Sequence, residues 1–256
     1  MSCWLKALPL TLAIVVLSVI AISCNTGNTS QVRFINAVPD TAQYGTALDL
    51  EFNGTKDFTG IAFSGYQPAS GYTSVPAGGD TIKGFGTGTT TQVFVSNVSL
   101  DTGLQYTLVA TGFATNASSV AIISADDNNT VPANGKVDFR VIHASPSGPA
   151  VDVYIIPIDT SLPSCPSTNC ISDLPYRSTS PYVTIPYSTN VVDGLNYTLV
   201  VTATGTTTPI LSQNLYAGDA SAGAICTLVL TDTLNDNPKG MNPLAILLND
   251  LNCANN

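Results

Sequence analysis

The chain uses one pattern of residues twice, and this repeat limits the fold more than any other feature of the sequence. Residues 32–52 read VRFINAVPDTAQYGTALDLEF, and residues 139–155 read FRVIHASPSGPAVDVYI. Each segment carries an arginine within an apolar run, then Ala-x-Pro, then an aspartate between aliphatic residues. Because a sequence repeat reports one structural unit used more than once, we expect the fold to divide into two similar halves.

The similarity continues in the same order along both halves. The further aligned pairs are YQPASGYTSVP (66–76) with YRSTSPYVTIP (176–186), GTTT (88–91) with GTTT (205–208), Thr107-Leu108-Val109 with Thr227-Leu228-Val229, and VAIISADDN (120–128) with LAILLNDLN (244–252). We therefore predict repeat 1 over residues 31–128 and repeat 2 over residues 137–256. The turn-rich segment NTVPANGK at residues 129–136 is the predicted linker.

Short β-rich segments bounded by Gly, Pro, Asn and Asp recur along the chain. They include QVRFINA, ALDLEF, TQVFVSNV, YTLVAT and SVAIIS, and no segment carries a convincing helical stripe. In ALDLEF, alternation puts Leu48, Leu50 and Phe52 on one face of a strand. Asp49 and Glu51 lie on the other face. The pattern predicts an all-β fold with two tandem immunoglobulin-like β-sandwich domains.

The N-terminus indicates export. After Lys6, residues 8–22 form an apolar run shorter than the roughly 20 residues of a transmembrane helix, as in a signal peptide. The following Ala-Ile-Ser-Cys resembles a bacterial lipobox, with Ala21 where leucine is usual. We predict a lipoprotein signal peptide over residues 1–23, lipidation of Cys24 and a polar tether over residues 24–30. An ordinary signal peptide and a retained membrane anchor are the alternatives.

Cysteine use agrees with export. Beyond Cys24 the chain contains an even number of cysteines, namely Cys165, Cys170, Cys226 and Cys253. Of the three pairings that four cysteines allow, order along the chain favours Cys165–Cys170 and Cys226–Cys253. Zinc is the competing interpretation of SCPSTNC, but the spacing is wide and no second pair lies at a matching distance. No metal site is therefore predicted.

Three segments of the second repeat carry a resemblance to a known family. The segments are Arg-Val-Ile-His-Ala-Ser-Pro (140–146), Pro-Ala-Val-Asp-Val-Tyr (149–154) and Ser-Pro-Tyr-Val-Thr-Ile-Pro (180–186). They resemble the bacterial domain-of-unknown-function family numbered 4397. The first repeat follows the pattern more loosely, with Asn36 where the family has histidine. The resemblance implies an all-β fold that occurs in tandem in exported proteins and lipoproteins. It implies no catalytic residues.

The charge of the chain excludes one class of partner. The formal net charge is −9, and the eight basic residues are scattered along the sequence. No basic stripe is present that could neutralise phosphates, so we expect no nucleic-acid partner. Only 10% of the residues are charged, against about 25% in an ordinary soluble protein. Abundant Thr, Asn, Ser and Gly in their place are typical of extracellular all-β domains.

Two arginines are candidates for structural ion pairs. Arg33 and Arg140 share a strand face with aliphatic and small residues in each repeat. If that face is covered, each guanidinium needs a carboxylate. Asp49 and Asp152 lie on the adjoining predicted strand, so we predict the pairs Arg33–Asp49 and Arg140–Asp152.

Tyrosines gather in one region of each repeat. Tyr66, Tyr72, Tyr176 and Tyr182 are candidate ligand-binding residues, because exposed aromatic rings on a β-sandwich can stack on sugars or bind peptides. The alternative is that they close the edge of the sandwich.

No catalytic residue and no cofactor are predicted. His143 is the single histidine, and repeat 1 has Asn36 in its place, so an activity shared by both repeats cannot depend on it. The Asp/Asn-rich segments 126–129 and 232–237 offer oxygen ligands to calcium, but turn formation explains them equally well.

Together these features predict an exported, lipid-anchored protein of the bacterial cell envelope, at the outer membrane or cell surface. We expect a non-enzymatic binding or scaffolding role, with the membrane contacted through the lipid and an envelope glycan or protein as partner. The alternative is a hydrolase acting on envelope or extracellular polymers.

Overall fold

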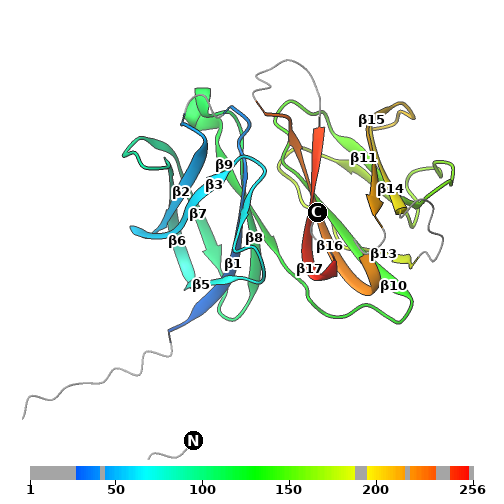
Figure 1. Ribbon diagram of the computed structural model, residues 1–256, viewed down its shortest axis with the longest axis horizontal. Coiled ribbons are helices and arrows are strands. Elements are labelled where there is room, and N and C mark those ends of the chain that lie inside the picture. Colours follow the sequence, from blue (N-terminus) through cyan, green and yellow to red (C-terminus); the bar gives the residue numbers. More distant parts are fainter. Residues whose placement is uncertain (1–26, 41–43, 188–194, 217–219, 235–242, 254–256) are drawn as a thin grey trace, which may run out of the picture.

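The computed structural model describes residues 27–40, 44–187, 195–216, 220–234 and 243–253, which form two β-sandwiches side by side (Figure 1). The predicted signal peptide and Cys24 lie outside these residues. Regular structure other than strands is limited, within the described ranges, to a short 3-10 helix at Ala114–Ser119. In the same ranges no helix has the length and apolarity needed to cross a membrane.

The first sandwich consists of two sheets. Sheet I has the order β4-β1-β8-β9, with β5 also pairing with β1, and sheet II has the order β3-β2-β6-β7. The strands are β1 (Thr29–Ala37), β2 (Ala47–Phe52), β3 (Thr55–Ala62), β4 (Tyr66–Gln67), β5 (Thr73–Pro76), β6 (Gly78–Gly86), β7 (Gln92–Leu100), β8 (Gln105–Thr111) and β9 (Ala121–Asp126).

The second sandwich has the same connectivity. Sheet III has the order β13-β10-β16-β17, and sheet IV has the order β12-β11-β14-β15. The strands are β10 (Lys136–His143), β11 (Val151–Pro157), β12 (Cys170–Leu174), β13 (Val183–Pro186), β14 (Leu195–Ala203), β15 (Pro209–Tyr216), β16 (Ala220–Asp232) and β17 (Pro243–Cys253).

The strand pairing confirms the all-β sandwich fold and adds its topology. In each sandwich one pair is parallel, β1 with β8 and β10 with β16, and the other pairs are antiparallel. The two parallel pairs have matching registers, because Arg33 lies opposite Thr107 and Arg140 lies opposite Thr227. Sheet I has five strands and sheets II, III and IV have four each, an arrangement that differs from the ABED and CFG sheets of an immunoglobulin constant domain.

Each sandwich encloses its own apolar core. In the first, Leu48, Leu50 and Phe52 of β2 pack against Val32 and Phe34 of β1. The predicted inward face of ALDLEF is therefore confirmed. In the second, a similar cluster includes Val151, Val153 and Ile155 of β11.

The two sandwiches meet through sheets I and III, with sheets II and IV on the outside (Figure 1). A third apolar cluster lies between them, and its buried members are Ile35, Ala37, Val109, Ile123, Ala125, Ile142, Ala144, Val229 and Leu248. Two reciprocal hydrogen bonds flank this cluster. Thr111 Oγ1 donates to the carbonyl of Ala144 at 2.6 Å, and the equivalent Thr231 Oγ1 donates to the carbonyl of Ala37 at 3.2 Å. Repeat-related residues thus cross the same interface in both directions.

The disulfide pairing favoured by chain order is confirmed. Cys165 and Cys170 are bonded with their Cα atoms 5.6 Å apart, and Cys226 and Cys253 with their Cα atoms 5.5 Å apart. The second bridge joins β16 to the end of β17, and both of its cysteines are fully buried. It therefore fastens the last described strand to the core of the second sandwich.

Candidate functional site

The polar centre of the molecule is a buried cluster of two arginines and two aspartates between the sandwiches. Arg33 from β1 and Arg140 from β10 face Asp127, just after β9, and Asp250 from β17. The side chains of both aspartates are 0% exposed, and those of Arg33 and Arg140 are 3% and 1% exposed. We call these four residues the interface cluster.

Each arginine binds the carboxylate contributed by the other sandwich. Arg33 Nη2 lies 2.5 Å from Asp250 Oδ1, and its Nη1 donates to the carbonyl of Asn249 at 3.0 Å. In the reciprocal arrangement, Arg140 Nη2 pairs with Asp127 Oδ1, and its Nη1 donates to the carbonyl of Asp126 at 2.6 Å. Charge-assisted bonds of this kind across a closed interface fix the orientation of the two sandwiches.

A threonine and a tyrosine complete each half of the cluster. Thr107 Oγ1 donates to Asp127 Oδ2 at 2.7 Å, and Thr227 Oγ1 donates to Asp250 Oδ2 at 2.5 Å. The guanidinium of Arg33 lies 5.4 Å from the ring centroid of Tyr72, and that of Arg140 lies 4.9 Å from the ring centroid of Tyr182. These distances are within the range of cation–π contacts.

The aspartates of the cluster correct the sequence alignment by one residue. The aligned segments place Asp126 with Asp250. In the structure, Thr107 pairs with Ala125 whereas Thr227 pairs with Leu248, so the counterpart of Asp250 is Asp127. The sequence alignment had no sign of this shift, because both positions 126 and 127 are aspartate.

The predicted pairs Arg33–Asp49 and Arg140–Asp152 are wrong. Strands β2 and β11 lie in the opposite sheets, II and IV, and their aspartates alternate with residues that point into the core. Asp49 accepts hydrogen bonds from the Gly60 amide at 2.8 Å and Thr87 Oγ1 at 2.7 Å, and it pairs with Lys56 at 2.9 Å.

Asp152 occupies the position of Asp49 in the second sandwich and has a similar role. It accepts hydrogen bonds from the backbone amides of Asp173 at 2.8 Å and Gly205 at 2.9 Å. The repeated Ala-Leu/Val-Asp motif therefore ties a strand to two neighbouring backbone segments. It does not neutralise the buried arginines.

Electrostatics in the interface cluster favour the ionised arginines and neutral tyrosines. Burial raises the pKa of Tyr72, and the Asp127 carboxylate raises it further. Burial likewise raises the pKa of Tyr182, with Asp250 and Asp127 adding to the effect. For both arginines burial alone lowers the pKa, but the carboxylates of Asp127 and Asp250 outweigh it and the net shift is upward.

The four candidate tyrosines separate into two groups. Tyr72 and Tyr182 are committed to the cluster, because their hydroxyls donate to Asp127 at 2.7 Å and to Asp250 at 3.3 Å. Tyr176 lies edge-on to His143, with ring centroids 6.0 Å apart, and beside Arg177. Tyr66 lines a pocket.

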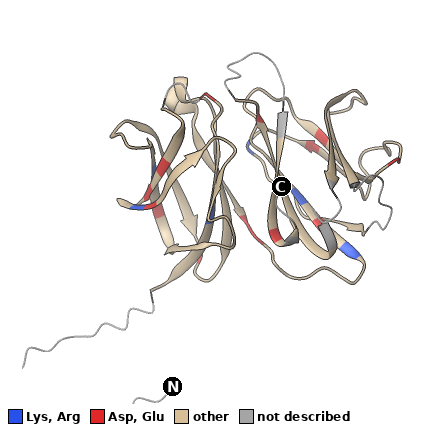
Figure 2. Ribbon diagram, in the orientation of Figure 1, with Lys and Arg blue, Asp and Glu red and all other residues tan. Residues whose placement is uncertain are grey.

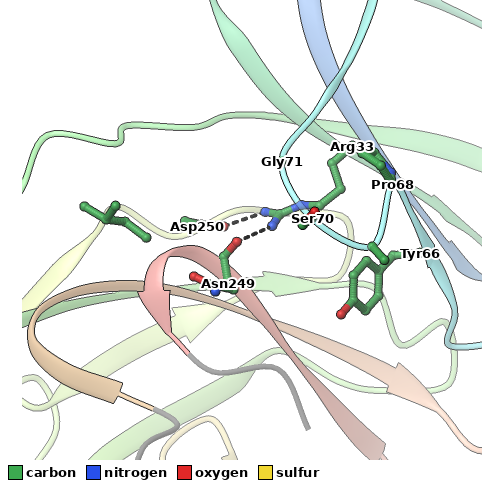
Figure 3. A pocket seen from close by; sticks show the side chains of 9 residues that line it. Arg33, Tyr66, Pro68, Ser70, Gly71, Asn249 and Asp250 are labelled. Atoms are coloured by element: carbon green, nitrogen blue, oxygen red, sulfur yellow. Dashed lines mark hydrogen bonds and ion pairs between the residues drawn. The ribbon is translucent and has the colours of Figure 1, made fainter.

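That pocket lies at the junction of the two sandwiches (Figure 3). Its volume is about 230 Å³. One side is formed by Tyr66 and the β4–β5 loop, the other by the end of β17, and the Arg33 side chain reaches between them. Its full lining is Arg33, Tyr66, Pro68, Ala69, Ser70, Gly71, Asn249, Asp250 and Leu251.

His143 is buried and has a local structural role. Its Nδ1 accepts a hydrogen bond from the Ser145 amide at 3.4 Å, so its Nε2 carries the hydrogen directed to the Pro149 carbonyl at 2.9 Å. In the first sandwich, Asn36 Oδ1 accepts the matching bond from the Val38 amide at 3.1 Å. Asparagine and histidine thus perform the same task at equivalent positions.

The pH dependence of stability should report the burial of His143. Burial lowers the pKa of this imidazole below its usual 6.5, with the Pro149 carbonyl and Asp232 opposing the shift. As the pH falls below 6.5, His143 takes up a proton in the unfolded chain but not in the folded chain. The free energy of unfolding therefore decreases as the pH is lowered through this range. Urea unfolding between about pH 7.5 and pH 5.5 should show this loss, and His143→Asn should remove it. An unchanged pH slope in the variant would contradict the assignment.

The Asp/Asn-rich segments have other partners in the structure. Asp127 belongs to the interface cluster, and Asp232 accepts hydrogen bonds from the Ser145 hydroxyl and the Ser147 amide. Residues 235–237 lie outside the described residues. Among the described residues, no three His, Cys, Asp or Glu side chains gather in a way that could hold a metal ion.

The charged residues outside the cluster are few and spread over both sandwiches (Figure 2). This distribution agrees with the scatter of basic residues along the sequence.

Comparison with protein families gives one match. Residues 30–154 match the model of the family described as "Domain of unknown function (DUF4397)". The matched segment contains β1 to β9 of the first sandwich and continues through β10 into β11 of the second. It includes the segments around Arg33 and Arg140 but ends before the Ser-Pro-Tyr-Val-Thr-Ile-Pro segment. A comparison with curated proteins gives no match.

Three solved structures show a distant likeness to this chain. The TIE protein of Bacillus anthracis is 11% identical, with 89% of this chain and 42% of that chain covered and a TM-score of 0.24. A leucine-rich repeat protein from Bacteroides thetaiotaomicron is 12% identical over 81% of this chain and 26% of that chain, with a TM-score of 0.21. The family CBM26 module CBMbc of Eubacterium rectale Amy13K, in complex with maltoheptaose, is 11% identical over 88% and 100%, with a TM-score of 0.22. The chain thus spans less than half the length of the first two. At these scores the likenesses carry no argument about function.

Proposed function

We propose that this protein is an exported, lipid-anchored component of the bacterial cell envelope with a non-enzymatic binding or scaffolding role. The observation that carries the proposal is the interface cluster. Reciprocal buried ion pairs and a shared apolar cluster hold two sandwiches in one fixed orientation. A rigid pair of domains is suited to presenting loops and edges to a partner, because little conformational freedom remains to be lost on binding.

The surroundings of His143 also favour a non-enzymatic role. Ser145 and Asp232 lie close by, but His143, Ser145 and Asp232 are at most 1% exposed. Gly148 covers the first two, since a Cβ atom at this glycine would lie 2.9 Å from His143 Cε1 and 3.1 Å from Ser145 Oγ. A substrate has no room to reach these groups, and a general base must lie within hydrogen-bond reach of its substrate.

We further propose that the two sandwiches are tandem copies of one domain. Three observations support duplication. The two sandwiches have the same strand order, Arg33 and Arg140 occupy matching registers, and Asp49 and Asp152 have similar hydrogen-bonding roles. Because both copies use the same face to bind each other, the surfaces left for partners are their loops and their outer sheets II and IV.

Glycan and protein arrays probed with residues 25–256 test the binding role. This fragment keeps every described residue. A specific glycan or envelope-protein ligand, bound without being altered, is the expected result. Turnover of an array polymer into smaller products would instead make the protein a hydrolase and overturn the proposal.

Cys24→Ala should block lipidation and the normal processing of the signal peptide. A lipoprotein carries several acyl chains, and each buried CH₂ contributes about 0.8 kcal/mol to membrane binding, so their loss removes the lipid anchor. Radioactive palmitate labelling and detergent partitioning of whole-cell extracts check this. The matched control is Cys3→Ala, which lies in the predicted signal peptide and should change neither readout. Unchanged labelling of the Cys24→Ala protein would contradict the anchor.

A further inference from the structure

We propose that the junction pocket beside Arg33 binds one neutral, hydroxyl-rich ring, such as a single sugar unit. This inference rests on the proposed binding role and names the site and the ligand chemistry for it. The pocket is formed by both sandwiches, so it exists only because they are docked in the observed orientation (Figure 3).

The first observation is a break in the symmetry of the interface cluster. Arg140 Nε donates to Thr227 Oγ1 at 2.7 Å. At the equivalent position, Thr107 Oγ1 receives its bond from Arg33 Nη2 at 2.8 Å, and Arg33 Nε has no hydrogen-bond partner among the described residues. A buried donor without an acceptor is unfavourable and rare in folded proteins. Arg33 is 3% exposed and lines the pocket, and Nε itself is buried, so we expect a ligand oxygen to become its acceptor after a small shift of the Arg33 side chain toward the pocket.

The second observation is the balance of charge around the pocket. Arg33 already lies 2.5 Å from Asp250 and 3.7 Å from Asp127. An anionic ligand would approach the Asp250 carboxylate, and a cationic ligand would approach the Arg33 guanidinium. Both are disfavoured where local charge is already compensated. A neutral oxygen, from a hydroxyl or a ring ether, can accept a hydrogen bond from Arg33 Nε without adding a charge to the cluster.

The rest of the lining suits a ring with polar edges. Tyr66 is half-buried and offers an aromatic ring with a hydroxyl, a combination that accepts ligands with one apolar and one polar side. Ser70 adds a second hydroxyl, and Pro68 and Ala69 add apolar surface. The volume of about 230 Å³ lies below the roughly 300–1,000 Å³ of pockets that enclose drug-sized molecules, so one ring fits and an oligosaccharide would extend outside.

The test is a titration of isotope-labelled residues 25–256 with single sugars, followed by amide NMR shifts. The probes are the neutral methyl glucoside, methyl galactoside and N-acetylglucosamine, with glucuronate and glucosamine as the anionic and cationic counterparts. We expect at least one neutral sugar to shift the amides of Ser70, Gly71 and Leu251 saturably, and more strongly than either charged sugar. Absence of shifts with all three neutral sugars, or preference for a charged sugar, would overturn the proposal.

Two variants locate the site. Tyr66→Ala should weaken binding at least tenfold, and Ala69→Trp, at an exposed loop position, should block the pocket without disturbing the core. Tyr176→Ala is the matched control, because Tyr176 is the repeat counterpart of Tyr66 but lies against His143. It should bind as the wild type does. If an array ligand binds equally well to the Ala69→Trp protein, the pocket assignment fails while the general binding role stands.

Discussion

Replacing Arg140 with alanine should lower the free energy of unfolding by about 3–5 kcal/mol, because the buried Asp127 carboxylate loses its short ion pair and keeps the longer one to Arg33 at 3.7 Å. Arg140 is 1% exposed and the Asp127 side chain 0% exposed, so water cannot replace the lost guanidinium. The same change removes the bonds of Arg140 to Thr227 and to the Asp126 carbonyl. Urea unfolding of the wild type and the variant measures the difference.

A double-mutant cycle identifies the partner of Arg140. Arg140→Ala combined with Asp127→Ala should cost clearly less than the two single changes added together, because the second change removes the carboxylate that lost its short ion pair. Arg140→Ala combined with Asp152→Ala is the control. Within the part of the chain that the structure describes, Asp152 accepts hydrogen bonds from the Asp173 and Gly205 amides and none from Arg140, so this pair should be additive. Additive losses in the first cycle would contradict the ion pair seen in the interface cluster.

Removing the Cys226–Cys253 bridge should cost about 3.5 kcal/mol in the chain-entropy model of disulfides. The bridge spans a sequence separation of 27 and ties β17 to β16. Since Asp250 is on β17, three residues before Cys253, loosening this strand also weakens the interface cluster. The measurement is unfolding of the Cys226→Ala, Cys253→Ala double variant.

The bridge Cys165–Cys170 provides an internal comparison. It closes a sequence separation of only 5, for which the same model gives about 2 kcal/mol. The Cys165→Ala, Cys170→Ala variant should therefore be the more stable of the two double variants. The reverse order of stabilities would show that the C-terminal bridge does not fasten β17.

The sequence was sufficient to predict an all-β sandwich fold, because the alternation of apolar and polar residues within its strands matches the burial seen in the structure. Alternation in ALDLEF placed Leu48, Leu50 and Phe52 in the core, where they lie. Arg33 and Ile35 were expected on one face, and that face is covered. A two-residue period specifies which side of a strand is buried, but it does not specify what covers that side.

That missing information explains the error at the ion pairs. Asp49 lies on the strand that follows Arg33 in the sequence, so the sequence alone predicts the two as neighbours in space. The actual partner, Asp250, lies in the second sandwich. Asp127 belongs to an Asp/Asn-rich segment, a composition that predicts a turn or calcium ligands and not an ion pair. The available signal was an aspartate near the end of the last strand of each repeat, Asp127 just after β9 and Asp250 within β17. Only the docking of sheet I on sheet III gives those aspartates their role.

The reciprocal contacts between sheets I and III also limit how such repeats can assemble. Each sandwich presents the corresponding face to the other, as the bonds of Thr111 to Ala144 and of Thr231 to Ala37 illustrate. In an isologous contact of this kind both partners use the same face, so neither face remains free for a third partner. Repeats that rely on this face therefore form closed pairs and cannot grow by stacking into the open solenoids built by head-to-tail repeats.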